Sequence, residues 1–226
     1  MELKRLTERI WYYPFEEARD RPNLFYIRGS RWSLAVDAGH SGAHTRAFYR
    51  ALEEAGLALP ALTVLTHWHW DHTFGMYAVH GLTLCNRRTN EALCDFAKQV
   101  ESRGRAWFLS MHESIAREYV EGEPIVVKTS DLTFEGAMDL DAGDCPVHLF
   151  QAPSPHTEDA TLIYLPGERT LLYGDATSGP FPNYSQRDPV LARAFADTLV
   201  GVDADIFAGS HWVPLTKAEA IAEALE

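Results

Sequence analysis

Three imidazoles and a carboxylate crowd into the short stretch Thr66-His67-Trp68-His69-Trp70-Asp71-His72, directly after the apolar run Leu62 to Leu65. Such a density of nitrogen and oxygen donors is typical of a metal site. On an extended segment alternate side chains face the same way, so His67, His69 and Asp71 would share one side. The two tryptophans would then face the other way, and His72 would fall where the chain turns. A His-rich surface loop is the alternative interpretation.

Three further candidate donors, His156, Asp175 and His211, each come shortly after a predicted strand. His156 lies in Ser154-Pro155-His156-Thr157-Glu158-Asp159, Asp175 follows Leu171-Leu172-Tyr173-Gly174, and His211 follows Ala208-Gly209-Ser210. Because a strand end lies at the edge of a sheet, such positions can present a side chain to a shared site.

The elements that must position these donors alternate between strands and helices. Predicted strands cover 10–13, 23–28, 32–36, 62–65, 125–129, 132–134, 138–140, 147–151, 161–165, 170–173 and 206–208. Helical patterns cover 43–55, 87–101, 106–119 and 189–199, and a last helix begins after Thr216, with Gly104 between the second and third. Several strands flanked by helices in each half predict two packed sheets with helices on both outer faces.

The chain resembles the metallo-β-lactamase superfamily in five ordered motifs, which are an early Asp after a strand, His-x-His-x-Asp-His, a His, an Asp and a late His. Here they are Asp37, residues 67–72, His156, Asp175 and His211, spread across nearly the whole chain. The resemblance implies an α+β fold, an αββα four-layer sandwich. We expect a single domain over 1–226, with a helical insertion at about 87–120 beside the site.

Carried over motif by motif, the resemblance implies a binuclear site. His67, His69 and His156 would hold one metal, Asp71, His72 and His211 the second, and Asp175 would bridge the two. Asp37 would orient ligands without touching metal, although a simple turn residue is an equal alternative. Two departures concern loop conformation: Pro155 and Ser210 stand where the family commonly has Gly before its third-motif and last His.

Composition narrows the function classes. The 226 residues are 46% hydrophobic and carry 20 basic against 32 acidic side chains, a net charge of −12, which disfavours nucleic acid and anionic membranes as partners. The first ten residues are charged, and no apolar run approaches the roughly 18 residues of a membrane span. Cys85, Cys94 and Cys145 form no Cys-x-x-Cys pair and are interpreted as buried, reduced thiols. We therefore expect a cytoplasmic protein, and the sequence leaves its oligomeric state open.

Imidazole and carboxylate donors without thiolate suit two Zn²⁺ ions and leave Fe or Mn open. Such a pair lowers the pKa of a shared water to about 7, so a bridging hydroxide could attack a carbonyl without a Ser or Cys nucleophile. Asp71 is the expected catalytic residue, because it could orient that nucleophile and shuttle a proton. The expected substrate is a small acyl compound of the ester, thioester, lactone or lactam class.

Other assignments stay open at this point. Aromatic side chains could line an acyl pocket, namely Trp68, Trp70, Trp107, Phe108 and Tyr184, although Trp70 and Phe108 fit a core better. Tyr184 is a candidate oxyanion donor. The remaining histidines, His40, His44, His80, His112 and His148, are interpreted as structural, with His40 closest to a motif. An iron-dependent oxidoreductase of the persulfide dioxygenase type is the alternative function, and an inactive binding protein is a third.

Overall fold

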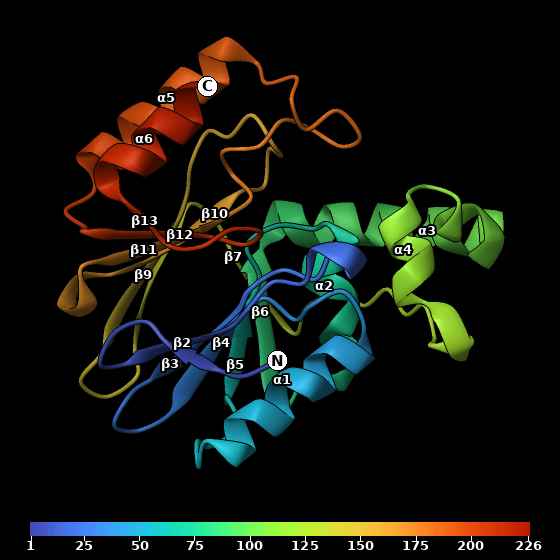
Figure 1. Cartoon of the computed structure of the whole chain (residues 1–226), viewed down its shortest axis with the longest axis horizontal. Coiled ribbons are helices and arrows are strands. Elements are labelled where there is room, and N and C mark those ends of the chain that lie inside the picture. Colours follow the sequence, from blue (N-terminus) through green and yellow to red (C-terminus); the bar gives the residue numbers. More distant parts are fainter.

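The computed structural model describes residues 1–226, except for the side chain of Glu121. Two β-sheets pack face to face, and helices cover the outer face of each (Figure 1). This arrangement confirms the predicted αββα sandwich. Among the helices that the structure describes, none combines the length and apolar character needed to cross a bilayer.

The first sheet has seven strands, and their order in the sheet follows the chain. They are β1 (Lys4–Arg5), β2 (Ile10–Tyr13), β3 (Leu24–Arg28), β4 (Ser33–Val36), β5 (Leu62–Val64), β6 (Leu82–Asn86) and β7 (Leu132–Phe134). Strands β1 to β4 pair antiparallel, whereas β4 to β7 pair parallel. The carboxyl ends of β4 and β5 therefore lie side by side at one edge, which brings Asp37 next to Thr66 and His67.

The second sheet has six strands in the order β13-β12-β11-β10-β9-β8. They are β8 (Ala137–Asp141), β9 (Pro146–Gln151), β10 (Thr161–Leu165), β11 (Thr170–Gly174), β12 (Ile206–Gly209) and β13 (Leu215–Thr216). Strands β9 and β11 both run antiparallel to β10, and β12 runs parallel to β11. All three therefore end at the same edge, and His156, Asp175 and His211 follow them there.

The main core lies between the sheets, where Val36 and Val64 of the first meet Leu149, Ile163 and Leu172 of the second. Helix α1 (Gly42–Glu54) packs on the outside of the first sheet, and α5 (Pro189–Gly201) and α6 (Lys217–Leu225) pack on the outside of the second. Apolar side chains are therefore buried at three interfaces, one between the sheets and one between each sheet and its helices. Together these interfaces hold in place the two sheet edges that carry the candidate metal donors.

Helices α3 (Arg87–Leu109) and α4 (Glu113–Glu118) extend beside the site edge (Figure 1). Gly104 interrupts α3 with a φ of 78°, as the sequence predicted. An aromatic cluster joins these helices to the short helix α2 (Trp70–Thr73); its fully buried members include Trp70 and Phe108, which are core residues. The chain also forms 3₁₀ helices η1 (Glu17–Arg19), η2 (Phe74–Ala78), η3 (Val120–Gly122) and η4 (Pro166–Glu168).

Three sequence-based expectations of local structure were wrong. Residues 125–129 form no strand, because Ile125 and Val127 pack against the helical and aromatic clusters instead of a neighbouring strand. Strand β6 was missed directly before the predicted helix, where its run Leu82–Asn86 mixes apolar with polar residues. Cys94 is exposed on α3, whereas Cys85 and Cys145 are buried as expected.

Candidate metal centre

The His-rich stretch bends sooner than an extended segment would. Strand β5 ends at Val64, and α2 begins at Trp70, so His67 and His69 come from a loop and Asp71 from a helical turn. The hydroxyl of Thr73 donates to the carbonyl of His69 (2.8 Å) and helps to close this turn. The expectation that Asp71 shares one side with His67 and His69 was therefore wrong, because the helical turn places Asp71 in a different group.

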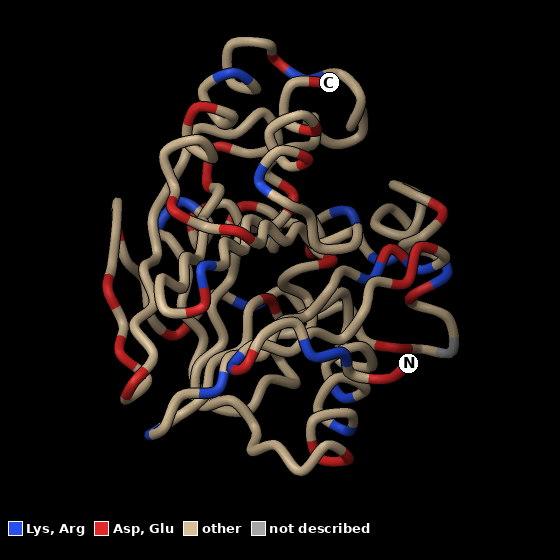
Figure 2. Tube along the Cα trace, turned by 60° about the vertical axis from the view of Figure 1, so that its left-hand side comes forward, with Lys and Arg blue, Asp and Glu red and all other residues tan. Residues whose placement is uncertain are grey.

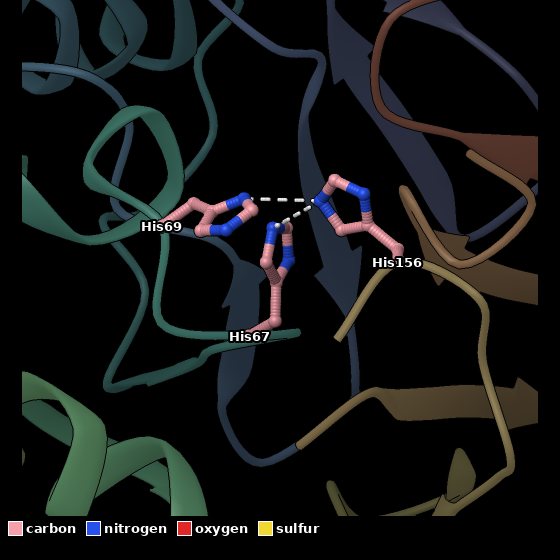
Figure 3. A group of neighbouring side chains, drawn as sticks. All are labelled: His67, His69 and His156. Atoms are coloured by element: carbon pink, nitrogen blue, oxygen red, sulfur yellow. Dashed lines mark hydrogen bonds between the residues drawn. The ribbon is translucent and has the colours of Figure 1, made fainter. Parts of the chain in front are cut away.

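The first group consists of three buried imidazoles from both halves of the chain (Figure 3). His156 Nε2 lies 3.2 Å from His67 Nε2 and 3.0 Å from His69 Nδ1. His156 Nδ1 donates to the carbonyl of Gly179 (2.7 Å), so its Nε2 keeps the lone pair. Nitrogen atoms pointed at one another in this way suit a common cation.

The second group contains Asp71, His72, Asp175 and His211. Asp71 Oδ2 lies 3.0 Å from the Nε2 atoms of both His72 and His211. Asp175 Oδ2 lies 3.3 Å from the same two nitrogens and 3.8 Å from His156 Nε2 of the first group. Asp175 thus stands between the two groups, within reach of both.

Asp37 sets the orientation of one imidazole in each group. Its Oδ1 accepts from the N–H of Thr66 (2.8 Å), its Oδ2 accepts from His72 Nδ1 (2.8 Å), and it also accepts from the Thr66 hydroxyl (3.0 Å). Since that hydroxyl has donated its only hydrogen, its oxygen accepts from His67 Nδ1 (3.1 Å). Both imidazoles therefore carry their hydrogen on Nδ1 and present the Nε2 lone pair to the site.

Left-handed backbone turns direct two of these carboxylates. Asp37 has a φ of 65° and Gly174, directly before Asp175, has a φ of 59°. A Cβ at Gly174 would also lie 2.9 Å from the Thr66 side chain. Only glycine tolerates both the conformation and the close approach, so the strand-end turn before Asp175 depends on it.

The two loops that depart from the family pattern are closed by other contacts. Ser154 Oγ accepts from the N–H of His156 (3.0 Å) and donates to the carbonyl of Ala176 (3.0 Å), which fixes the loop around Pro155. The N–H of Ser210 donates to the carbonyl of Gly174 (3.1 Å). Asn23 donates to the carbonyls of Gly209 (2.9 Å) and Trp212 (2.8 Å), which ties the His211 loop to the first sheet.

The first-group imidazoles are held neutral. Burial lowers the pKa of His67 well below its ordinary value, and neighbouring imidazoles lower it further. Burial, with His156 beside it, lowers the pKa of His69 to about 3. Burial also lowers the pKa of His156. Neutral imidazole is the form that binds a metal.

The second group is a set of tightly coupled charges. Burial opposes the charged form of each member, but mutual attraction outweighs burial: the pKa values of Asp71 and Asp175 lie well below their usual range, and those of His72 and His211 well above. Two carboxylates directed at two imidazole nitrogens require positive charge between them, from protons or from a cation.

The donor set fits a metal ion. His72 Nε2 and Asp175 Oδ1 are buried without any hydrogen-bond partner, although such polar groups are costly to bury unpaired. The ligand atoms within each group all lie within 4.8 Å of one another. Imidazole nitrogen and carboxylate oxygen together suit zinc, manganese or iron.

Each group of donors borders a cavity. One cavity, of about 480 Å³, is bordered by Asp71, Asp175, His211 and Tyr184. The other, of about 650 Å³, is bordered by His69 and His156. Each is large enough for a small molecule.

Asp20, Asn23 and Thr66 contribute to the site in ways that the sequence did not indicate. Asp20 Oδ1 lies 3.6 Å from His211 Nδ1, and its left-handed φ of 53° aims it at the cavity. Asp20 and Asn23 lie some 190 residues before His211, so no local motif signals the contacts. Thr66 begins the His-rich stretch, yet its role depends on Asp37 across the sheet.

The five remaining histidines lie outside both groups of donors. His40, the one nearest a motif, is fully buried and donates from Nδ1 to the carbonyl of Arg19 (2.9 Å). His44 is buried beside Tyr13. Their contacts agree with the structural interpretation.

The model of the Metallo-beta-lactamase superfamily matches residues 19–220, and the chain therefore belongs to this superfamily. Members are generally metal-dependent hydrolases, and the His and Asp groups described above are what such a protein needs to bind divalent metal.

Solved structures show the same fold. A metallo-beta-lactamase from Pontibacter korlensis superposes with a TM-score of 0.70 at 15% identity, covering 99% of this chain and 96% of that one. The DIM-1 metallo-beta-lactamase gives 0.69 at 16% identity over 100% and 96%, and a metallo beta lactamase from Hirschia baltica gives 0.67 at 17% over 99% and 95%. At these identities the likeness concerns the fold alone.

A curated relative also matches part of the chain. A linear primary-alkylsulfatase from Pseudomonas sp. (strain ATCC 19151) is 30% identical over 112 residues, which make up 46% of this chain and 21% of the relative. The chain thus spans about a fifth of the length of the curated relative it matches.

Proposed function

We propose that this protein is a binuclear metal-dependent hydrolase of small acyl compounds, of the ester, thioester, lactone or lactam class. The observation that supports this best is the convergence of seven donors into two groups that share Asp175 and open on cavities. Such a division provides places for two ions, with zinc as the expected metal and Fe or Mn as alternatives.

His67, His69 and His156 would hold one ion, Asp71, His72 and His211 the other, and Asp175 would serve both. Two ions held there would supply hydroxide near neutral pH as the nucleophile toward the carbonyl, because such a pair lowers the pKa of a bound water to about 7. Asp71 would orient this nucleophile and pass its proton to the leaving group as the bond between the carbonyl carbon and that group breaks. Tyr184 borders the cavity beside Asp71, and its hydroxyl is our proposed donor to the developing oxyanion.

The setting of the site completes the proposal. Residues 1–226 would form one domain, with 87–120 as a helical insertion that walls the site. The three cysteines form no disulfide, in keeping with a cytoplasmic location. Lys and Arg are scattered among more numerous acidic residues (Figure 2), so we propose a small molecule as the partner, with neither nucleic acid nor membrane.

Two other reactions compete with acyl hydrolysis. A persulfide dioxygenase would use one iron, and a single ion does not account for both buried groups of donors. The match to an alkylsulfatase raises hydrolysis of sulfate esters as a second candidate. Among the described residues no Lys or Arg borders the first cavity, and Arg88 is the one basic residue that borders the second, so few side chains are available to hold a sulfate group.

The test is a screen of chromogenic esters, lactones, a cephalosporin and an alkyl sulfate, with and without chelator, alongside elemental analysis of the purified protein. We expect about two equivalents of metal and chelator-sensitive hydrolysis of an acyl substrate. One iron with oxygen uptake would replace the proposal by the oxidoreductase. Hydrolysis that survives complete removal of metal would refute it.

A further inference from the structure

The cavity beside the second group has an unusual lining of carboxylates and aromatic rings. Besides the donors themselves, Glu17 and Asp20 border it on one side, and Phe15, Tyr184 and Trp212 supply aromatic surface. No Lys or Arg borders it in the part of the chain that the structure describes. Bound metal ions would more than offset Asp71 and Asp175, and Asp20 lies 3.6 Å from His211 Nδ1, so Glu17 is the carboxylate whose charge is left at the mouth.

Nearby guanidinium groups are already paired with other carboxylates. Arg19 lies 3.7 Å from Glu16, Arg21 lies 2.8 Å from Glu118, and Arg117 pairs with Glu113. Glu17, in contrast, is exposed on η1 and has no ion-pair partner among the described side chains. Its charge is therefore available to a ligand.

Asp20 lies deeper and faces the reactive centre. It accepts from the hydroxyl of Ser114 (3.4 Å), and its other oxygen lies near His211. Glu17 and Asp20 therefore add two carboxylates to the border of the cavity that do not belong to the groups of metal donors.

The second cavity also has more acidic than basic side chains on its border. Arg88 borders it, but so do Glu91, Glu158 and the buried Asp159. Aromatic faces combined with carboxylates are the chemistry that binds an ammonium group, through cation–π and Coulomb attraction.

We propose that the cavity between η1 and Tyr184 binds a positively charged amine of the substrate, with Glu17 as a specificity-determining residue. The substrate class is then an ester, lactone or amide that carries an ammonium group a short distance from its carbonyl. This inference rests on the proposed hydrolase function for the reaction, but the binding preference can be measured separately.

The binding experiment uses the zinc-loaded protein and three probes of similar size, measured by calorimetry. Phenyltrimethylammonium should bind about five- to tenfold more tightly than the neutral 2-phenylpropan-2-ol and more tightly still than benzenesulfonate. Glu17→Gln should reduce the ratio of the affinities for the cationic and neutral probes about threefold, and Glu17→Lys should abolish the preference for the cation. Glu53→Lys, an equal charge change on α1, serves as the matched control and should change nothing.

The hydrolysis experiment uses phenyl esters whose acyl chains end in trimethylammonium, tert-butyl or carboxylate. We expect the highest kcat/KM for the cationic ester, and Glu17→Gln should lower the ratio of kcat/KM for the cationic ester to that for the neutral ester about threefold. Equal binding of the three probes, or a preference for the anion, would overturn the cation site even if the esters are hydrolysed. Selective binding of the cation without hydrolysis of any ester would support the site and reject the hydrolase.

Discussion

Substitution of Asp37 by Asn should selectively weaken the second metal position. The variant keeps the size of the side chain, and Asn tolerates the left-handed φ of 65° at this position. The amide has one acceptor oxygen, whereas Asp37 accepts from the Thr66 N–H and from His72 Nδ1 at 2.8 Å each. Whichever way the amide turns, its NH₂ group faces one of these two donors.

The main-chain N–H of Thr66 cannot change, but an imidazole can change its tautomer. We expect His72 to move its hydrogen to Nε2, where it would point at Asp71 and Asp175, within 3.0–3.3 Å, and no longer offer a lone pair. Loss of such a supporting contact costs about 10- to 100-fold in metal affinity, equivalent to about 1.4–2.7 kcal/mol.

The assay is competition between the protein and a chromogenic chelator, which gives the stoichiometry and the two zinc affinities, with ¹⁵N spectra of the imidazoles to report the tautomer. Asp131→Asn is the matched control: Asp131 accepts from the N–H and hydroxyl of Thr83 (2.8 Å each) at an exposed position far from any metal donor. If Asp37→Asn binds two zinc ions as tightly as the wild type, the argument about the tautomer is wrong.

Four shorter predictions concern catalysis and stability. Asp71→Ala should reduce kcat about 10²- to 10⁴-fold with an unchanged near-UV circular dichroism spectrum, whereas Asp197→Ala on α5 should retain full activity. Glu118→Ala should lower the free energy of unfolding by about 3 kcal/mol, because the buried guanidinium of Arg21 loses both oxygens of Glu118 and keeps only Glu16, at 3.3 Å. Arg21→Met/Glu118→Leu should recover most of the loss in thermal unfolding. Burial lowers the pKa of His44 well below 6.5, so below pH 6.5 the unfolded chain binds a proton that the folded protein does not bind, and the free energy of unfolding falls. Relative to His44→Asn, the wild type should lose up to about 1.4 kcal/mol per pH unit. Parallel curves of unfolding free energy against pH for the two proteins would contradict this. Zinc at about 1,000 times its Kd should stabilise the metal-stripped protein by about 4 kcal/mol per site, and an unchanged Tm would show that metal does not bind the folded state preferentially.

The sequence predicted the sandwich well because apolar strands and amphipathic helices carry strong periodic signals. The strand over 125–129 failed because alternating Ile125 and Val127 pack on helices, and alternation alone does not say what covers a segment. The turn at Trp70 was missed because the hydrogen bond that closes it involves the Thr73 hydroxyl, which the extended interpretation did not consider.

Residue types and order similarly predicted which candidate donors lie together, whereas the supporting contacts could not be predicted. Asp20 and Asn23 act on the His211 loop across nearly the whole length of the chain. Such contacts depend on how the two sheets dock, and one chain without its fold contains no signal for that. The acidic lining of the cavity was hidden for the same reason, because η1 and the Tyr184 loop meet only in three dimensions.

The donors are divided between the two halves of the molecule, since residues 67–72 follow β5 of the first sheet while His156, Asp175 and His211 follow strands of the second. Neither half alone contains a complete set of donors, so a cation bound between the two sheets would stabilise only the correctly docked arrangement. The supply of metal in the cell would then affect how much of this protein reaches its native state. A shortage of metal would leave the two sheets more prone to separate.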